Sequence, residues 1–237
     1  MTPFTLRSDV TVDLIKHSAS DSDVVSAARV STVGEQSQIE VPQARQEGLI
    51  NYLMRDRHGS PFEHNSMTFF INAPIFVFRE FMRHRVGWSY NEESGRYREL
   101  HPVFYVPATD RNLVQEGKPG AYTFLLGPET LRGQMMKEMA EAYHRAYAHY
   151  TMLLSKGIAR EVARMVLPVG LFSSMYATCN ARSLMHFLSL RTTHEQATVE
   201  SSPQREIEMV AEQMEARWAT LMPLTHSAFT RNGRVAP

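Results

Sequence analysis

Cysteine and lysine are both scarce in this sequence. Cys179 is the only cysteine, so no disulfide can form within the chain, and a reducing cytoplasm is the expected setting. The lysines are Lys16, Lys118, Lys137 and Lys156, which leaves 21 arginines among the 25 basic residues. Codon bias explains such a total, but it does not explain the clusters in which these arginines occur.

Long apolar runs and an excess of one charge are also missing. No apolar run approaches the roughly 20 residues that a transmembrane helix needs, and the opening MTPFTLRSDV lacks the pattern of a secretory signal. The formal net charge is zero, with 25 basic and 25 acidic residues, whereas a nucleic-acid groove requires a basic excess. We therefore expect no membrane partner and no nucleic-acid partner.

The common cofactor and catalytic motifs are absent as well. The sequence contains no GxGxxG, no GxxxxGK[ST], no HExxH and no GxSxG. His58, Glu63 and His64 could in principle bind a metal, but their spacing favours a structural His–Glu set, so no metal is expected. Cys179 has apolar surroundings, which favour a buried thiol over a nucleophile.

Length and periodicity define the expected fold. The 237 residues are 43% hydrophobic, enough for one domain over residues 1–237. Strands are predicted at 10–17, 67–71, 102–107 and 171–179. Helices are predicted at 20–32, 42–57, 74–83, 128–156, 158–167, 180–191, and from the cap at 201–203 to Pro223. This order does not form repeated βαβ units, so we expect an α+β fold with a mostly antiparallel sheet packed with several long helices. Residues 111–127 are expected to be a surface loop and the tail RNGRVAP to be loose.

Residues 83–97, RHRVGWSYNEESGRY, are too polar to belong to the core. They come four residues after the apolar segment IFVF at 75–78. This stretch combines Arg83, Arg85 and Arg96 with carboxylates, hydroxyls and two glycines. Guanidinium groups are planar, bidentate partners of phosphate and carboxylate. We predict that this stretch lies at a helix end and in the loop after it, and that it binds an anionic ligand.

Arginine recurs with polar neighbours in two later helices. The residues are Arg160 and Arg164 in the first helix, and Asn180, Arg182, His186, Arg191 and His194 in or near the second. Residues four apart share a helix face, so Arg160 lies with Arg164, and Arg182 projects with His186. For Arg160 taken by itself, a solvent-exposed helix face with ion pairs is a sufficient explanation. The polar groups together interrupt otherwise apolar segments, which favours a site that holds several phosphates.

These residues resemble a known signature. Residues 83–97 are similar to RHRxxSxNExSxRY of the flavin-dependent thymidylate synthases, with Ser89 to Tyr97 in register. Val86-Gly87-Trp88 places three residues where the usual pattern has two, so the loop must absorb an extra residue. HGSPFEH, APIFVFREFMRHR, REVARMVLP and NARSLMHFLSLR also look like family segments, and the resemblance covers about residues 10–230.

The resemblance implies a methyltransferase that makes dTMP from dUMP. The methylene group would come from 5,10-methylenetetrahydrofolate and the reducing equivalents from NADPH through FAD, without a cysteine nucleophile. It also implies an intertwined homotetramer whose sites combine several subunits. The alternative is a nucleotide-binding module or regulator that lacks the redox step.

The resemblance also implies residue roles by position. FAD would contact Ser60, Arg83, His84, Arg85, Glu92, Asn180, Arg182 and His186. Deoxyuridylate would contact Glu80, Arg83, Glu92, Glu93, Ser94, Gly95, Arg96, Arg164 and Arg191. Arg191 would be catalytic, because a guanidinium beside the uracil ring favours its anion. Glu80 would contact the nucleotide through its backbone or be paired, since a carboxylate near a phosphate is repulsive.

Overall fold

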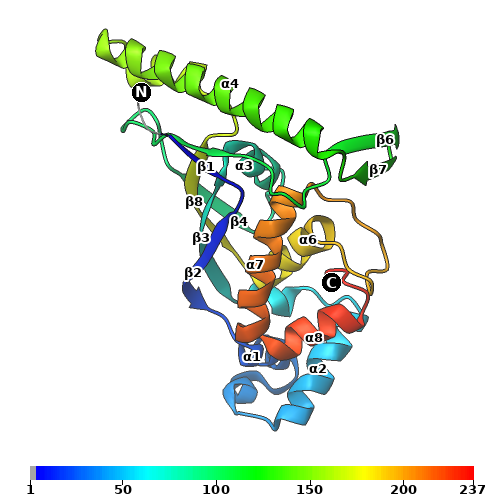
Figure 1. Cartoon of the computed structure of the whole chain (residues 1–237). Helices are drawn as coiled ribbons and strands as arrows, with labels where there is room; N and C mark the ends of the chain where they lie inside the picture. The colour runs from blue at the N-terminus through cyan, green and yellow to red at the C-terminus, as the bar shows by residue number, and fades with distance from the viewer. Residues whose placement is uncertain (1–3) are drawn as a thin grey trace. The chain divides into compact units, whose positions relative to one another are not determined.

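The computed structural model describes residues 4–237, which form two compact units (Figure 1). Unit 1 comprises Ala73–Phe76, Glu93–Ser173 and the N-terminal residues through Asp9. Unit 2 comprises Val10–Asn72, Val77–Glu92 and Ser174–Pro237. The chain passes between them several times, so neither unit is a contiguous stretch of sequence. The predicted α+β class is confirmed.

Unit 2 is built around a four-stranded sheet in the order β2-β3-β8-β4. Its strands are β2 (Thr11–Ser18), β3 (Ser66–Pro74), β8 (Phe172–Cys179) and β4 (Trp88–Glu92). β2 pairs with β3, and β4 with β8, in antiparallel register. The Thr68 and Thr178 hydroxyls are 2.9 Å apart and Asn72 donates to Ser174, so β3 and β8 also run in opposite directions. The predicted antiparallel sheet is confirmed.

Six helices of the described chain belong wholly or mostly to unit 2. They are α1 (Asp21–Val33), α2 (Gln43–Arg55), α3 (Ile75–Phe81), α6 (Ala181–Arg191), α7 (Arg205–Leu221) and α8 (Pro223–Arg231), with short turns η1 (Gly34–Gln38) and η2 (Ser60–Glu63). α7 runs beside β2, where Gln213 donates to the Val10 carbonyl and Arg217 to that of Val12 (Figure 1). α6 buries Leu184 and Phe187, and Phe187 stacks on Phe81 of α3 with ring centroids 4.6 Å apart. This packing fixes α6 and α3, which carry Arg182, Arg191 and Glu80.

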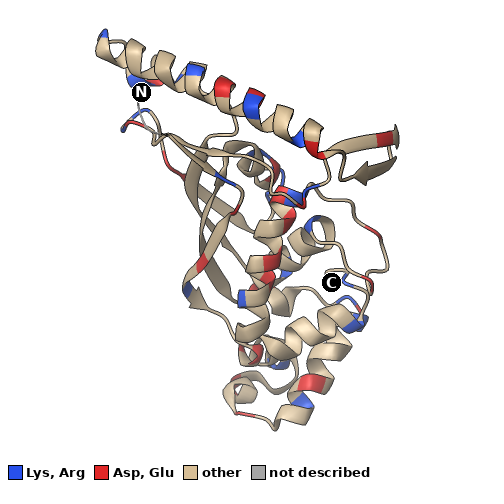
Figure 2. Cartoon of the chain, in the orientation of Figure 1, with Lys and Arg blue, Asp and Glu red and all other residues tan. Residues whose placement is uncertain are grey.

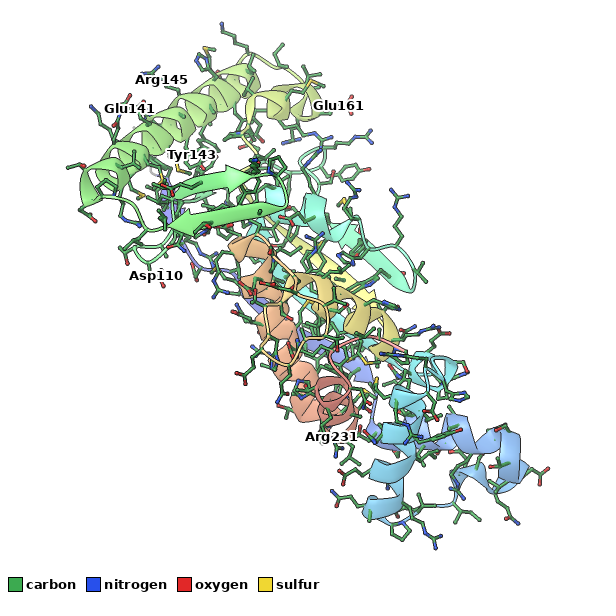
Figure 3. The ribbon with its side chains drawn as sticks, turned by 90° about the vertical axis from the view of Figure 1, so that its right-hand side faces the viewer. Asp110, Glu141, Tyr143, Arg145, Glu161 and Arg231 are labelled. Atoms are coloured by element: carbon green, nitrogen blue, oxygen red, sulfur yellow. The ribbon has the colours of Figure 1, made fainter. Side chains whose placement is uncertain are left out.

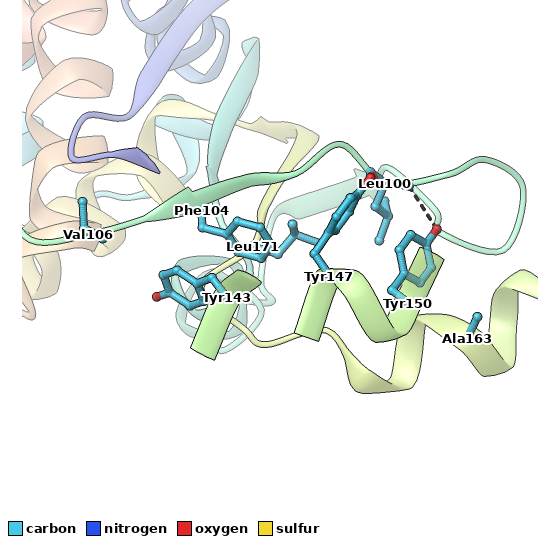
Figure 4. Packing of buried hydrophobic residues seen from close by; sticks show 8 residues of the cluster. All are labelled: Leu100, Phe104, Val106, Tyr143, Tyr147, Tyr150, Ala163 and Leu171. Atoms are coloured by element: carbon cyan, nitrogen blue, oxygen red, sulfur yellow. Dashed lines mark hydrogen bonds between the residues drawn. The ribbon is translucent and has the colours of Figure 1, made fainter. Parts of the chain in front are cut away.

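Unit 1 packs a long helix against a short parallel strand pair. β1 (Thr5–Arg7) pairs with β5 (Val103–Tyr105), and α4 (Glu129–Ser155) buries Tyr143, Tyr147 and Tyr150. Their hydroxyls bond to the backbone of the segment that contains β5; Tyr150, for example, accepts from the Leu100 amide (Figure 4). On the opposite, solvated face, Glu141 and Arg145 lie one turn apart and form an ion pair (Figure 3). The rest of unit 1 is β6 (Val114–Lys118), β7 (Ala121–Leu125), α5 (Arg160–Ala163) and η3 (Arg164–Val166).

Several local predictions are wrong. Residues 88–92 form strand β4 and not a loop, because they pair with β8 although their side chains are polar. Residues 114–125 form the β6–β7 hairpin, and Gly120, with a φ of 84°, permits the turn between Lys118 and Ala121. Arg160 and Arg164 do not share an α-helix, because α5 ends at Ala163 and a 3-10 turn follows. Within residues 4–237 there are eight strands, twice the number predicted.

The C-terminal tail also differs from expectation. Pro223 begins helix α8 and does not only end α7, in line with the preference of proline for the first helical turn. The tail expected to be loose is held by Arg234, whose exposed fraction is 2%. The backbone of Gly233 accepts from the Thr198 amide, and Ala236 and Pro237 are buried.

Charge and hydropathy agree with the composition. Acidic and basic residues are both spread over many elements, whereas α7 carries mainly acidic residues and the charged residues of α6 are Arg182 and Arg191 (Figure 2). In the described part of the chain, no helix combines the length and the apolar character needed to span a bilayer.

Candidate ligand-binding site

A cavity of about 350 Å³ opens in unit 2 beside the first turns of α6. Its lining residues are Glu63, His84, Arg85, Val86, Trp88, Arg182, Ser183 and His186. Four of the residues predicted to bind a cofactor, His84, Arg85, Arg182 and His186, therefore meet in one cavity. Two guanidiniums, two imidazoles and an indole suit a ligand that has both an anionic group and a flat ring.

The start of α6 aims its residues into this cavity. Asn180 caps the helix, and its side-chain oxygen accepts from the Ser183 amide over 2.8 Å. Asn65 accepts from the Ala181 amide, also over 2.8 Å, and ties the cap to the turn after η2. The predicted shared face of Arg182 and His186 is confirmed, because both line the cavity. The helix N-terminus adds a partial positive charge near the cavity.

Arg182 is held in place by two oxygens. Its Nη1 donates to Glu63 Oε1 and its Nε to the Pro237 carbonyl, both over 2.6 Å. Gly59 passes so close that a Cβ there would clash with the guanidinium. The side chain is about one-third exposed, so it still faces the cavity. A guanidinium oriented in this way before ligand binding loses little conformational entropy on binding.

A tight turn absorbs the extra residue of the signature. The Trp88 amide donates to the Arg85 carbonyl over 3.3 Å, and Gly87 has a φ of 70°, as the third position of a type II turn requires. A Cβ at Gly87 would clash with the Ser183 hydroxyl, which donates to the Val86 carbonyl. The turn therefore rests against α6, while the Val86 side chain is 90% exposed. Arg85 and Trp88 at its two ends both reach the cavity.

Arg191, at the end of α6, lies between a carboxylate and an imidazole. Its Nη1 donates to Glu80 Oε2 over 2.8 Å and its Nε to His84 Nε2 over 3.2 Å. Burial, together with the charge of Arg191 and the nearby His186, lowers the pKa of His84 to about 4. The imidazole is therefore neutral at pH 7, and its Nε2 can accept from Arg191.

Glu80 is the counterion of Arg191. Burial raises the pKa of Glu80, Arg191 opposes that shift, and Glu206 adds to it. Its second oxygen, Oε1, is buried without a hydrogen-bond partner. Pairing with Arg191 agrees with the expectation that a carboxylate at this position is paired, and it leaves Oε1 available to a donor.

Unit 1 holds a second group of predicted residues. Arg96 pairs with Glu161 over 3.0 Å, and the Arg96 amide donates to the Ser94 hydroxyl over 3.3 Å. Gly95 is buried, and a Cβ there would press on Leu100 and on the Arg164 side chain. Ser94, Gly95, Arg96 and Arg164 are thus close together. Arg96 is about half exposed, so its guanidinium is accessible to an anion.

Some predicted residues lie outside these two groups. Ser60 and Arg83 are exposed and do not line the cavity, and Glu92 lies in β4 opposite Met175. Glu93 pairs with Arg98 over 3.2 Å. Their roles toward FAD or deoxyuridylate stay predictions. The assignment of Arg83 to both ligands has no support from the cavity lining.

Four cavity residues were not assigned a role from the sequence: Glu63, Val86, Trp88 and Ser183. Ser183 is the third residue after the cap Asn180, and this capping pattern could have indicated it. Glu63 was considered as a metal ligand and as part of a structural His–Glu set, and no group of three or more His, Cys, Asp or Glu residues that could hold a metal lies within residues 4–237. Nothing in the sequence indicated that Trp88 lines the cavity, because its position depends on the pairing of β4 with β8. Cys179 is buried and its pKa is raised by burial, which favours an inert thiol.

Known proteins are similar to this chain in sequence and in fold. The family described as thymidylate synthase complementing protein matches residues 13–224. A flavin-dependent thymidylate synthase of Streptomyces avermitilis is 72% identical over 98% of this chain and 95% of its own length. One of Streptomyces coelicolor is 69% identical over 98% of this chain and 95% of its own length. Crystal structures of PolB, a UMP/dUMP methylase from Streptomyces cacaoi, are 58% identical and cover 99% of this chain. For the structure with 5-Br UMP the TM-score is 0.92 and the match covers 99% of the PolB chain. For the structure with 5-Br dUMP the TM-score is 0.93 and the match covers 100% of the PolB chain.

Proposed function

The chain belongs to the family of flavin-dependent thymidylate synthases, and we propose that it converts dUMP to dTMP with bound FAD. The observation that carries the proposal is the cavity of unit 2, which gathers Arg85 and Arg182 with His84, His186 and Trp88. FAD, when bound, supplies the hydride of the reaction. NADPH as its reductant and 5,10-methylenetetrahydrofolate as the methylene donor belong to the proposal as well.

The cavity residues fit the flavin cofactor. Arg85 and Arg182 provide donors for the diphosphate, and the capped start of α6 adds a partial positive charge. Trp88 provides an aromatic surface for a ring, and the neutral His84, whose Nε2 accepts from Arg191, keeps its Nδ1–H as a donor. Gly59 and Gly87 leave no room for side chains beside Arg182 and Ser183, so these two residues keep their positions.

Deoxyuridylate is proposed to contact Arg191 and the residues of the second group, which a site built from several subunits of a homotetramer would combine. Arg191 would donate to the uracil ring and stabilise its anion, which raises the electron density at C5 for attack on the methylene group. Glu80 and His84, its partners at 2.8 and 3.2 Å, would orient the guanidinium. Ser94, Gly95, Arg96 and Arg164 would hold the phosphate through the hydroxyl, the backbone amides and two guanidiniums. A homotetramer with sites shared between subunits remains part of the proposal.

UMP is a second candidate substrate. PolB, at 58% identity, is a methylase of both UMP and dUMP, whereas the relatives at 72% and 69% identity are thymidylate synthases. The higher identities favour dUMP. Parallel turnover assays with the two nucleotides distinguish these substrates, because ribose adds a 2′-hydroxyl that a pocket shaped for deoxyribose excludes.

Flavin binding tests the proposal. The purified chain, reconstituted with FAD, should show oxidised-flavin absorbance that NADPH bleaches under anaerobic conditions. Arg182→Ala should weaken FAD binding by about tenfold or more, because it removes a charge-assisted contact. The control is Arg145→Ala, whose guanidinium is 75% exposed on α4. A folded wild-type chain that binds dUMP but cannot bind FAD would support the alternative of a nucleotide-binding regulator and contradict the proposal.

A further inference from the structure

The residues Arg234–Pro237, here called the C-terminal strap, contact both ends of α6. Arg234 is buried and forms a bidentate ion pair with Glu215 of α7, over 2.6 and 2.7 Å. Its Nη2 also donates to the Thr192 hydroxyl over 2.8 Å, and its guanidinium lies 5.0 Å from the Phe229 ring centroid. The strap therefore begins at a fixed point beside the residue that follows Arg191.

Thr192 connects the strap to the end of α6. It is 5% exposed, and its amide and hydroxyl both donate to the Leu188 carbonyl, over 3.0 and 2.7 Å. Its own carbonyl accepts from Ser201 over 2.5 Å. Because Thr192 is peptide-bonded to Arg191, the position of its backbone sets the direction from which the Arg191 side chain leaves the helix.

The other end of the strap reaches the start of α6. Arg57 donates to the Val235 carbonyl and Arg182 to the Pro237 carbonyl, each over 2.6 Å. Four consecutive residues thus touch Arg182 at one end of the helix and Thr192 at the other. Arg182 and Arg191 are the two residues of α6 that the proposed function assigns to the flavin and to the uracil ring.

The backbone at the start of the strap is strained. Gly233 and Arg234 have φ values of 75° and 54°, and the second is costly for a residue with a side chain. A Cβ at Gly233 would clash with the Thr198 hydroxyl. Strain of this kind persists where surrounding contacts determine the conformation, and here the ion pair with Glu215 and the bond to Thr192 do so.

Stability alone does not explain this arrangement. A buried ion pair contributes little net stability relative to apolar residues of the same volume, but it imposes one geometry. Burial opposes ionisation of Glu215, yet hydrogen bonds from Arg234 and His226 outweigh it and lower the pKa of Glu215 to about 2. The pair is therefore charged throughout the physiological range and holds the strap in a single position.

We propose that Arg234 is a positioning residue for the reaction, which holds Arg191 through Thr192 and holds Arg182 through the strap. The inference rests on the proposed function, since it assigns to the strap the orientation of residues that contact the flavin and the nucleotide. The role of Arg234 does not depend on where the ligands bind, so it can also be tested in the flavin-free protein.

Thr192→Val and Thr192→Ser test the proposal as a matched pair. Valine keeps the shape and removes the hydroxyl that Arg234 contacts, whereas serine keeps the hydroxyl. In the FAD-loaded enzyme, Thr192→Val should lower kcat for dTMP formation about tenfold, with flavin content and KM for dUMP near the wild-type values. Thr192→Ser should stay close to wild type, as should Arg231→Ala, which removes only an exposed pair with Glu47.

Hydrogen exchange gives a readout that does not depend on turnover. In the flavin-free protein, the peptide spanning residues 186–195 should exchange faster in Thr192→Val than in Thr192→Ser. Valine also loses the hydroxyl bond to Leu188, so Arg234→Lys is the second variant. Lysine keeps a charge beside Glu215 but lacks the fork that reaches Thr192 as well, and the same loss of kcat is expected. This variant also serves if Thr192→Val does not fold.

The outcomes separate the strap from the proposed function. Wild-type protein that binds FAD but forms no dTMP contradicts the proposed function, and the exchange data then decide on the strap. Wild-type turnover in Thr192→Val and Arg234→Lys overturns the positioning role, whatever the exchange rates are. Equal losses in Thr192→Val and Thr192→Ser overturn it as well, because the serine keeps the contact with Arg234.

Discussion

Arg191 and Glu80 form an ion pair at the end of α6, with Nη1 and Oε2 2.8 Å apart and each side chain about one-fifth exposed. The neutral His84 accepts from the same guanidinium over 3.2 Å. The residue proposed to stabilise the uracil anion is thus already oriented by a carboxylate and an imidazole. Preorganised donors of this kind stabilise developing charge more than flexible ones, because they need little reorganisation.

Substitution of Arg191 should remove catalysis and leave the fold. Arg191→Ala is expected to lower kcat for dTMP formation by at least about a hundredfold, because the uracil anion loses its charged donor. Arg191→Lys should recover only part of this loss, since an ammonium lacks the planar fork. Steady-state kinetics, flavin absorbance and thermal melting check the expectation. Unchanged turnover in a flavin-loaded Arg191→Ala protein would exclude Arg191 from this role.

Neutralising Glu80 should cost little stability, whereas deleting its side chain should cost more. Burial already disfavours its carboxylate, so Glu80→Gln should change the free energy of unfolding by less than about 1 kcal/mol. Glu80→Ala should cost about 1–3 kcal/mol, because it leaves an Arg191 donor unpaired. Urea unfolding of both variants measures the difference. Equal losses in the two would show that the charge, and not the hydrogen bond, holds Arg191.

Gly87 should tolerate no side chain. Gly87→Ala forces a methyl group against Ser183 at a φ of 70°, so we expect a loss of about 1–3 kcal/mol and weaker FAD binding. Gly48→Ala is the matched control, because this glycine lies in α2 with open space around its Cβ. There alanine should stabilise the helix by about 0.5–1 kcal/mol. Chemical unfolding and FAD titration give both values, and a stable Gly87→Ala with normal flavin affinity would disprove the tight packing of the turn.

His84 should make the flavin-free protein less stable in mild acid. Its pKa is about 4 in the folded chain and near 6.5 in the unfolded one, so the unfolded chain binds more protons between these values. The contribution of the neutral His84 to the free energy of unfolding is complete above pH 6.5 and is lost as the pH falls through 4. The raised pKa of Glu80 acts in the opposite direction, and therefore the comparison is made with His84→Gln.

The measurement is the urea midpoint of wild type and His84→Gln at pH 7 and pH 5. Wild type should lose more stability on acidification than the variant does, because glutamine cannot be protonated. The same loss in both proteins would mean that His84 is not the group responsible.

The sequence was sufficient for the parts of the fold that follow from local patterns. The α+β class, the helix over residues 180–191 and the shared face of Arg182 and His186 depend on local periodicity, and all three are found. Strand β4 could not be predicted, because its polar residues form a strand only through pairing with β8, far along the chain. The buried tail was missed for the same reason, since Arg234 is stabilised by Glu215 and Thr192.

For the site, the resemblance named residues that composition could not. It placed Arg182 and His84 near a cofactor, but it could not predict that Arg182 is held by Glu63 or that Arg191 pairs with Glu80. Such pairs depend on the three-dimensional arrangement of η2, α3 and α6. The position of Trp88 could not be predicted either, because the extra residue at 86–88 is absorbed in a turn whose form depends on contact with Ser183.

The most direct test is an anaerobic single-turnover reaction of the FAD-loaded chain with dUMP, 5,10-methylenetetrahydrofolate and NADPH, with flavin absorbance and nucleotide product recorded together. The proposed function predicts that NADPH bleaches the flavin, that dTMP forms in proportion to bound flavin, and that the absorbance returns as dTMP appears. Bleaching and recovery without dTMP, or dTMP formed by protein that holds no flavin, would contradict the proposal.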